Sequence, residues 1–151
     1  MNTAWPLTIY YDASCPLCAR EMHALAAHDA NARLRLVDCS PPSFADAECA
    51  AAGIGREALM QAIHARDGEG RWHRGIAVFE LAYRGAGIEG IAALWAHPWL
   101  RPIWERAYPW VALHRMGLSR LGFSRPFGWL VAMLARRAQR RARACRDGRC
   151  E

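Results

Sequence analysis

Two cysteines separated by two residues are the side chains of this sequence best suited to chemistry. Cys15 and Cys18 stand in the stretch YYDASCPLC, where an apolar run ends and a helical pattern begins at Pro16. A pair at this spacing can exchange disulfides, supply half of a metal site, or form two buried thiols. The elements around the pair favour one of these chemistries.

The residues before the pair predict a strand, and those after it predict a helix. The segment Leu7–Asp12 is short, β-branched and aromatic, which is typical of a buried strand. After Pro16, the side chains of Cys18, Met22 and Leu25 recur at helical spacing on one face. The pair is therefore expected at a turn from strand to helix.

This placement predicts different chemistry for the two sulfurs. Cys15 is expected at the helix start, where free backbone N–H groups and the positive end of the helix dipole stabilise a thiolate. Cys18 is expected to face the sheet, where burial keeps its thiol protonated. We expect an exposed Cys15 to attack a disulfide and a shielded Cys18 to resolve the mixed disulfide. Asp12 either accepts the proton of Cys18 through a water or caps the turn.

The rest of the chain predicts an α/β fold. The expected elements are a strand over Arg33–Asp38, a helix from Pro42 or Ser43 to Gly53, two strands in Leu59–Gly75 around the turn Asp67–Gly70, and a helix from Ile76 to Gly85. The resulting order, β-α-β, helix, β-β-α, is that of a thioredoxin-like domain with helices on both faces of its sheet. No Gly-rich loop follows a strand, which excludes a Rossmann pattern.

After Gly90 the composition shifts to Trp, Pro and Arg. Prolines at 98, 102, 109 and 126 are predicted to divide this part into short helices, which cannot form a second core alone. We expect a thioredoxin-like core over residues 1–90, a helical extension packed on it over 91–135, and a flexible Arg-rich tail over 136–151.

The charge of the chain is concentrated in that tail. All twenty basic residues are arginine, and the seven between Arg136 and Arg149, against Asp147 and Glu151, give the tail +5 of the net +6. Such a tail suits an anionic membrane surface or nucleic acid, or is a solvated chain end. With no basic leader and no apolar run of about 18 residues, we expect a cytoplasmic protein whose cysteines are not structural bridges.

The other cysteines form weaker patterns. Cys39 and Cys49 stand ten residues apart, and Cys145 and Cys150 form a looser pair. A zinc site would need a second close pair of ligands, so we expect no metal and no cofactor. Cys39 follows the second strand at the same sheet edge as Cys15, either as an auxiliary thiol or as a buried edge residue. His23 is expected at the surface.

Four segments resemble a known family. They are YDASCPLC, the hairpin HARDGEGRWHRG, the helix start GIAVFELAYR and the later HPWLRPIWERAYPWVALHR. Together they are similar to the DCC family of thiol-disulfide oxidoreductases, long classed as a domain of unknown function, over about residues 5–118. The family takes its name from an Asp and two Cys, which match Asp12, Cys15 and Cys18 here.

The resemblance implies a thioredoxin-like fold and a redox role toward a protein or small-molecule disulfide. Tyr108 and Arg115, in the last matched segment, either pack over the active-site edge or make a simple helix contact. Two departures stand out: Ala13 replaces the usual Gly after the Asp, and no proline precedes the third strand, where thioredoxins have a cis-proline. The alternative function is a non-catalytic binding module, stabilised by zinc or acting through the basic tail.

Overall fold

The sheet is built from four short strands. The computed structural model describes residues 3–120 and residue 133. Its strands are β1 (Leu7–Tyr11), β2 (Leu34–Asp38), β3 (His64–Arg66) and β4 (Trp72–Arg74), in the order β2-β1-β3-β4. Strands β1 and β2 are parallel, whereas β1–β3 and β3–β4 are antiparallel. This confirms the predicted βαβ unit, the hairpin and the thioredoxin-like fold.

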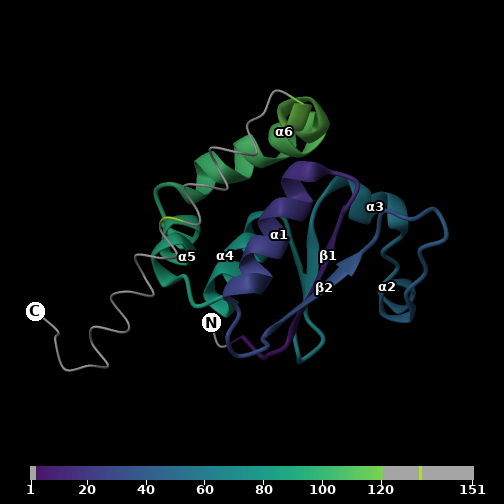
Figure 1. Cartoon of the computed structure of the whole chain (residues 1–151), viewed down its shortest axis with the longest axis horizontal. Helices are drawn as coiled ribbons and strands as arrows, with labels where there is room; N and C mark the ends of the chain where they lie inside the picture. The colour runs from purple at the N-terminus through teal and green to yellow at the C-terminus, as the bar shows by residue number, and fades with distance from the viewer. Residues whose placement is uncertain (1–2, 121–132, 134–151) are drawn as a thin grey trace, which may run out of the picture.

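Helices lie on both sides of this sheet, as predicted. In the described part of the chain they are α1 (Pro16–His28), α2 (Ala47–Ala51), α3 (Arg56–Gln61), α4 (Ile76–Gly85), α5 (Glu89–Ala96) and α6 (Arg101–Arg120). Figure 1 shows α1 crossing in front of the strands, α2 and α3 at one side of the molecule, and α4 and α5 at the other. Helix α6 runs over the end of the sheet at which α1 begins.

Alternate residues of β1 point into two separate apolar clusters. Leu7, Ile9 and Tyr11 pack with Met22 of α1 and Val78 of α4, among others, on one face. On the other face, Tyr10 packs in a second cluster with Cys39, Cys49 and Leu59. Because side chains alternate along a strand, one set of β1 side chains packs against the helices on one face and the other set against the helices on the opposite face.

The segment between β2 and β3 differs from the prediction. Its first helix begins at Ala47 rather than near Ser43, because the Asp46 carboxylate caps it by accepting the backbone N–H of Cys49 at 2.9 Å. A further helix, α3, occupies Arg56–Gln61, where the first residues of a strand were predicted. With six residues, α3 is too short to show a helical period, and its only buried residue is Leu59.

Pro109 does not divide the chain as predicted, because α6 continues through it from Arg101 to Arg120. A proline inside a helix removes one backbone hydrogen bond and weakens the helix locally. Contacts on both sides of Pro109 offset this loss. The Tyr108 hydroxyl accepts the Ile63 backbone N–H at 2.8 Å, and Arg115 donates to Asp12 at 2.7 Å.

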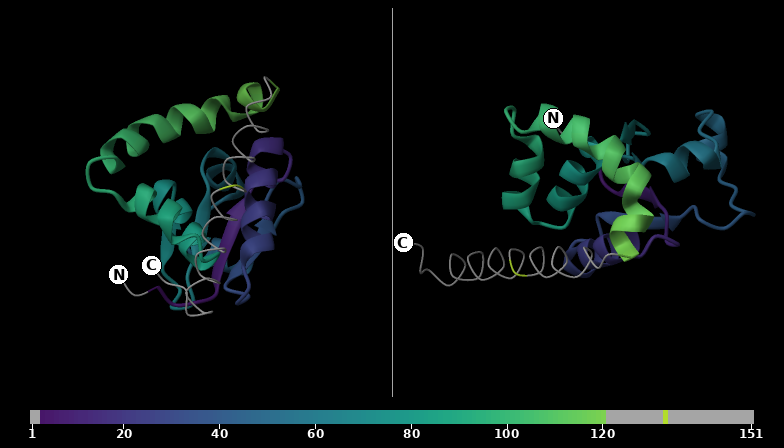
Figure 2. Two further views of the ribbon diagram at one scale, coloured as in Figure 1. Left: turned by 60° about the vertical axis from the view of Figure 1, so that its left-hand side comes forward. Right: turned by 90° about the horizontal axis from the view of Figure 1, so that it is seen from above.

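An aromatic cluster attaches α6 to the rest of the fold. Phe79 of α4 stacks on Trp95 of α5 at 5.4 Å between ring centroids, and Trp95 lies 5.1 Å from Trp104 of α6. Tyr108 meets Phe79 edge-on at 5.9 Å. Figure 2 shows the resulting arrangement, in which α6 passes across the top of the layer formed by α1 and the sheet. Three helices are thus joined by their rings.

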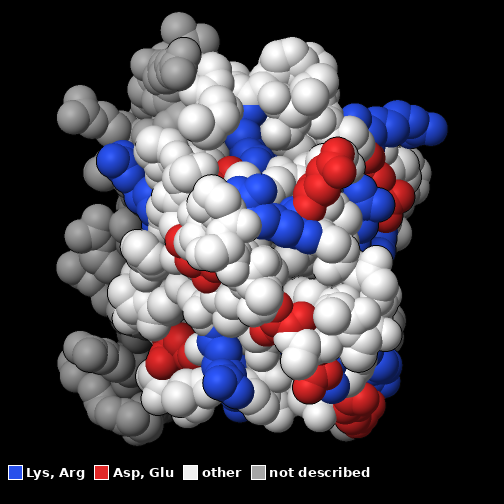
Figure 3. Space-filling view, turned by 90° about the vertical axis from the view of Figure 1, so that its right-hand side faces the viewer, with Lys and Arg blue, Asp and Glu red and all other residues white. Residues whose placement is uncertain are grey.

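The surface of the described residues mixes the two signs of charge. Figure 3 shows basic and acidic side chains side by side on one face. Examples are the ion pairs Arg66–Glu48 at 3.1 Å and Arg71–Glu69 at 2.9 Å. No helix among the described residues has both the length and the apolar character needed to cross a membrane. The Arg-rich tail over 136–151 lies outside the described residues, and the division at residue 90 stays a prediction.

The Tyr108 hydroxyl is expected to stabilise the docked position of α6. In Tyr108→Phe the Ile63 N–H loses its partner, so the free energy of unfolding should fall by about 1–2 kcal/mol in urea denaturation. Trp110→Phe, on the exposed outer face of the same helix, is the matched control and should change stability little. Equal effects of the two substitutions would contradict this role of the hydroxyl.

Candidate active site

The cysteine pair lies at the turn from β1 to α1, as predicted. Cys15 is the N-cap residue of α1, and Pro16 occupies the first helical turn, where its missing N–H is not needed. The Cys18 backbone N–H points to the Cys15 sulfur at 3.5 Å. The Cys18 thiol donates a hydrogen bond to the same sulfur, with the two sulfurs 3.0 Å apart. The pair is thus in the dithiol form and within reach of disulfide formation.

This hydrogen bond makes the two sulfurs unequal. The thiol of Cys18 and the backbone N–H groups of Cys18 and Leu17, helped by the charge of Arg115, lower the pKa of Cys15 to about 6 against the opposing effect of burial. The same hydrogen bond, together with burial, raises the pKa of Cys18. Near pH 7 the favoured state is a Cys15 thiolate that accepts a hydrogen bond from the protonated thiol of Cys18.

The predicted exposure of the pair is wrong, although the predicted order of the two pKa values agrees with the structure. None of the surface of Cys15 is exposed, whereas Cys18 is only partly buried. As the helix cap, Cys15 is turned inward toward the N–H groups of the first turn. Cys18 instead forms part of the wall of a cavity. The helical spacing of Cys18, Met22 and Leu25 predicted that Cys18 faces the sheet. It could not predict that α6 lies beside Cys18 and forms a cavity with it.

Asp12 caps the turn before Cys15, which was one of its two predicted roles. It also binds α6, which the sequence did not predict. Its Oδ1 accepts the Ser14 backbone N–H at 3.0 Å and the Ser14 hydroxyl, which closes the turn before Cys15. Its Oδ2 accepts a hydrogen bond from Arg115 Nη2 at 2.7 Å, in an ion pair where the Asp12 side chain is 4% exposed. Asp12 therefore fixes both the cysteine turn and α6.

The two departures from the family pattern are accommodated locally. Ala13 does not adopt a positive φ, and its N–H donates to Asp38 Oδ1 at 3.1 Å. The backbone before β3, where thioredoxins have a cis-proline, is covered by α6 through the bond from Ile63 N–H to the Tyr108 hydroxyl. Tyr108 and Arg115 thus both contact the active-site edge, which decides between the two interpretations left open.

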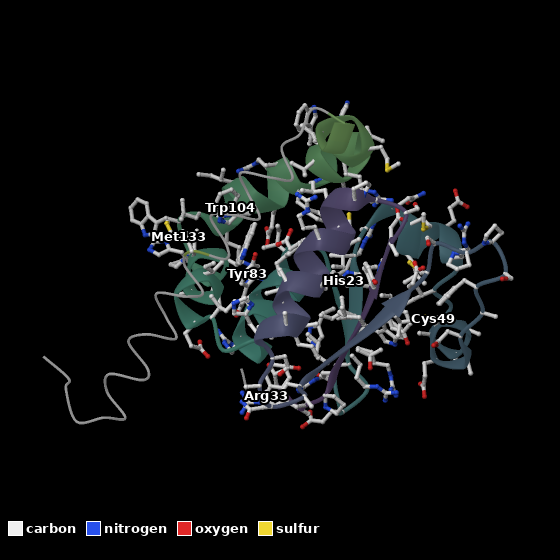
Figure 4. The ribbon with its side chains drawn as sticks, in the orientation of Figure 1. His23, Arg33, Cys49, Tyr83, Trp104 and Met133 are labelled. Carbon is white, nitrogen blue, oxygen red and sulfur yellow. The ribbon has the colours of Figure 1, made fainter. Side chains whose placement is uncertain are left out.

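Glu21 is a site residue that the helical pattern did not single out. It lies one turn after Cys18 and lines the same cavity. Burial raises the pKa of its carboxyl to about 7, although a hydrogen bond from the Tyr83 hydroxyl at 2.9 Å opposes the shift. Figure 4 shows Tyr83 on the same side of α1 as Trp104, with Cys49 on the other side. The contact between Glu21 and Tyr83 joins α1 to α4, so the sequence pattern of α1 alone could not predict it.

The cavity lies between α6 and the core, and we call it the α6 cavity. Its volume is about 320 Å³. Residues of α1, α4, α5, α6 and the end of β1 line it, together with Leu59 of α3 and Ile63 before β3. The polar side chains in its wall come mainly from the active-site edge: Asp12, Cys18, Glu21, Tyr108 and Arg115. Cys18 of the dithiol therefore borders a partly open, largely apolar cavity.

The remaining cysteines do not join the site. Cys39 is buried and its thiol donates to the Tyr11 carbonyl at 3.1 Å, and burial raises its pKa to about 11. Cys49 is buried in the cluster on the far face of the sheet. Within the described ranges no group of three or more His, Cys, Asp or Glu side chains could hold a metal ion. Cys145 and Cys150 lie outside the described residues, and His23 is exposed and contacts Tyr11.

Comparison with known proteins identifies the family. Residues 9–121 match the DCC1-like thiol-disulfide oxidoreductase family. The chain belongs to this family. It is also similar to an uncharacterized chloroplastic protein of Arabidopsis thaliana, with 27% identity over 85 residues, which span 56% of this chain and 39% of the relative. No solved structure matches the chain. Membership confirms the resemblance drawn from the four sequence segments and supports a general thiol-disulfide oxidoreductase role.

The hydrogen bond between the sulfurs predicts a shifted titration. In Cys18→Ala the largest cause of the low pKa of Cys15 is removed, so that pKa should rise from about 6 toward its ordinary value. The thiolate absorbance at 240 nm and the rate of iodoacetamide alkylation, both followed against pH, measure the shift. Cys39→Ala is the matched control and should leave the midpoint near 6. An unchanged midpoint in Cys18→Ala would show that the sulfur contact does not control the thiolate.

The Asp12–Arg115 pair predicts a strong coupling. Arg115→Met leaves a buried carboxylate without its charged partner, so the free energy of unfolding should fall by roughly 3 kcal/mol. Asp12→Asn in the same chain should recover part of this loss, which a double-mutant cycle in urea measures. Additive effects of the two substitutions would rule out a direct pair.

Proposed function

We propose that this chain is a dithiol enzyme in which Cys15 attacks a disulfide and Cys18 resolves the intermediate. The observation that carries the proposal is the short hydrogen bond from the Cys18 thiol to the Cys15 sulfur, which makes one sulfur a thiolate and keeps the other protonated. The family role supports the reaction class. A disulfide-containing molecule is the corresponding substrate.

The reaction balances through two exchanges. The Cys15 thiolate bonds to one sulfur of the substrate, and the other substrate sulfur leaves as a thiolate that takes up a proton. The Cys18 thiol then loses its proton and attacks Cys15, which releases the second substrate sulfur and leaves a Cys15–Cys18 disulfide. Two thiol groups, from low-molecular-weight or protein thiols, return the enzyme to the dithiol form and leave as a disulfide. We propose that this takes place in the reducing cytoplasm.

Two neighbouring groups suit the proton transfers of these steps. Arg115 favours the ionised form of both cysteines, which opposes the strong tendency of Cys18 to stay protonated. Glu21, with a pKa near 7, can exist in either protonation state at neutral pH inside the same cavity wall. Proton exchange at Glu21 would therefore not require direct contact between the sulfurs and bulk water.

The burial of Cys15 requires a movement before attack. Because its sulfur has no exposed surface, a disulfide reaches it only after neighbouring side chains shift. Helix α6 is the element best placed to shift, since a single hydrogen bond from Ile63, the Arg115 contacts and the aromatic cluster hold it beside the pair. The carbonyl of Met60 also accepts from Arg115, at 2.6 Å.

Replacement of the two cysteines should separate their roles. Cys15→Ser should abolish disulfide-reductase activity, because the hydroxyl is not ionised near pH 7 and cannot attack. Cys18→Ser should retain the first exchange and accumulate a mixed disulfide on Cys15, which peptide mass mapping locates. Cys49→Ser, on the far side of the sheet, is the control and should keep full activity. Full activity in Cys15→Ser, or a mixed disulfide on Cys18, would overturn the assignment.

A redox titration against glutathione buffers tests the couple itself. We expect a reversible Cys15–Cys18 disulfide, identified by alkylation and mass mapping, with a potential between those of glutaredoxin and thioredoxin. Metal content is determined on the same sample. Stoichiometric zinc bound by the pair, or two thiols that never form a disulfide, would place the protein among binding modules instead.

A further inference from the structure

The α6 cavity has the size and lining of a small-molecule site. Its volume of about 320 Å³ falls at the lower end of the range typical of ligand pockets. Its wall is predominantly apolar, with the aromatic rings of Phe79, Trp95 and Trp104 on one side and Cys18 on another. A protein substrate could not enter a space of this size, whereas a compact molecule could fill it.

Two hydrogen-bond donors in this wall have no partner. The indole Nε1 atoms of Trp95 and Trp104 are buried and make no hydrogen bond among the described residues. Buried indole N–H groups usually find an acceptor, and one without a partner is unfavourable. Both residues line the α6 cavity, from α5 and α6 respectively. An acceptor atom of a ligand would satisfy either donor once the indole ring turns its N–H group toward the cavity, because neither nitrogen has open surface there.

The charged groups of the wall are already satisfied. Asp12 and Arg115 neutralise each other at 2.7 Å, and the Glu21 carboxyl accepts a hydrogen bond from Tyr83 at 2.9 Å. A charged ligand would have to break one of these contacts or remain unpaired in an apolar space, which is unfavourable. The wall therefore selects against ionised molecules and against strongly polar ones.

We infer that the α6 cavity binds one small, neutral, largely apolar molecule that carries a hydrogen-bond acceptor for the indoles of Trp95 and Trp104. The inference rests on the proposed function in one respect: it makes such molecules, in disulfide form, the substrate class of the Cys15–Cys18 pair. The substrate disulfide then arrives at the cavity wall formed by Cys18, whose sulfur lies 3.0 Å from that of Cys15, and the movement described above brings it to Cys15.

A probe without sulfur tests binding apart from redox chemistry. Octanamide has an apolar chain and a neutral carboxamide whose oxygen accepts hydrogen bonds. We expect it to bind the full chain at one site per molecule in isothermal titration calorimetry. Trp104→Phe keeps a ring in place but removes the donor, so affinity should fall about fivefold, as expected for one hydrogen bond.

A second variant and a matched control keep this test decisive. Ala112→Leu adds volume to the cavity wall without touching the aromatic cluster and should also abolish most of the binding. Trp110→Phe changes the same residue type on the exposed face of α6 and should leave the affinity unchanged. Absence of one-site binding, or an equal loss of affinity in Trp110→Phe, would overturn the ligand site.

Two disulfides then test the substrate class. Lipoamide is neutral and largely apolar, whereas glutathione disulfide is larger and charged. We expect the full chain to reduce lipoamide faster than glutathione disulfide, Ala112→Leu to slow lipoamide reduction more than glutathione disulfide reduction, and Trp110→Phe to change neither rate. Equal rates for the two disulfides, with no effect of Ala112→Leu, would overturn the substrate class.

The two proposals can fail separately. A reversible Cys15–Cys18 disulfide without octanamide binding would overturn the cavity site and leave the dithiol function standing. Octanamide binding by a chain whose cysteines exchange with no disulfide would overturn the proposed function, and with it the assignment of the bound molecule as substrate.

Discussion

The ion pair between Asp12 and Arg115 is the contact on which the arrangement of the site depends. It joins the end of the first strand to the last described helix, 103 residues away, at a position where the carboxylate is almost fully buried. One oxygen of Asp12 closes the turn that presents Cys15, and the other binds α6. A buried carboxylate with one partner missing is strongly unfavourable, so the turn and the helix stabilise each other.

This coupling places a positive charge near both sulfurs. Arg115 favours the thiolate of Cys15, but it is the weakest of the causes that lower that pKa, and the main one is the thiol of Cys18. The thiolate is thus stabilised by the neighbouring thiol, whose sulfur lies 3.0 Å away. Burial would by itself raise the pKa of Cys15, and the fixed donors around the sulfur outweigh it.

The fold was largely predictable because its signals are local. The apolar segment of β1, the helical spacing after Pro16 and the Asp67–Gly70 turn each determine one element from a few neighbouring residues. α3 was missed because six residues give no periodic signal, and Pro109 was misread because its effect on α6 is offset by tertiary contacts. The rule that proline interrupts a helix considers the helix alone. In α6, Tyr108 and Arg115 are also held by residues far away in the sequence.

At the site, the identity of the cysteines could be predicted but their surroundings could not. The direction of both pKa shifts agrees with the prediction, but the largest cause of each is the hydrogen bond between the two sulfurs rather than the helix N-terminus or burial alone. Exposure is a property of the whole fold. Cys15 is buried because its role as helix cap turns it inward, and Cys18 borders a cavity because residues of α6 form part of the wall. Glu21 was overlooked for the same reason, since only contact with Tyr83 of α4 places its carboxyl in the interior.

The apolar cavity beside the pair imposes a condition on any substrate that enters through it. In water a thiolate is stabilised by solvent, but here fixed donors replace that solvent and the neighbouring space is apolar. A polar substrate would lose its hydration on entry and find few acceptors or donors in return. An apolar one gains by leaving water, roughly in proportion to the area it buries. Helix α6 both brings Arg115 to the pair and forms part of the wall of this space, so the reactivity of the thiolate and the proposed selectivity depend on the same contact between α6 and the end of β1.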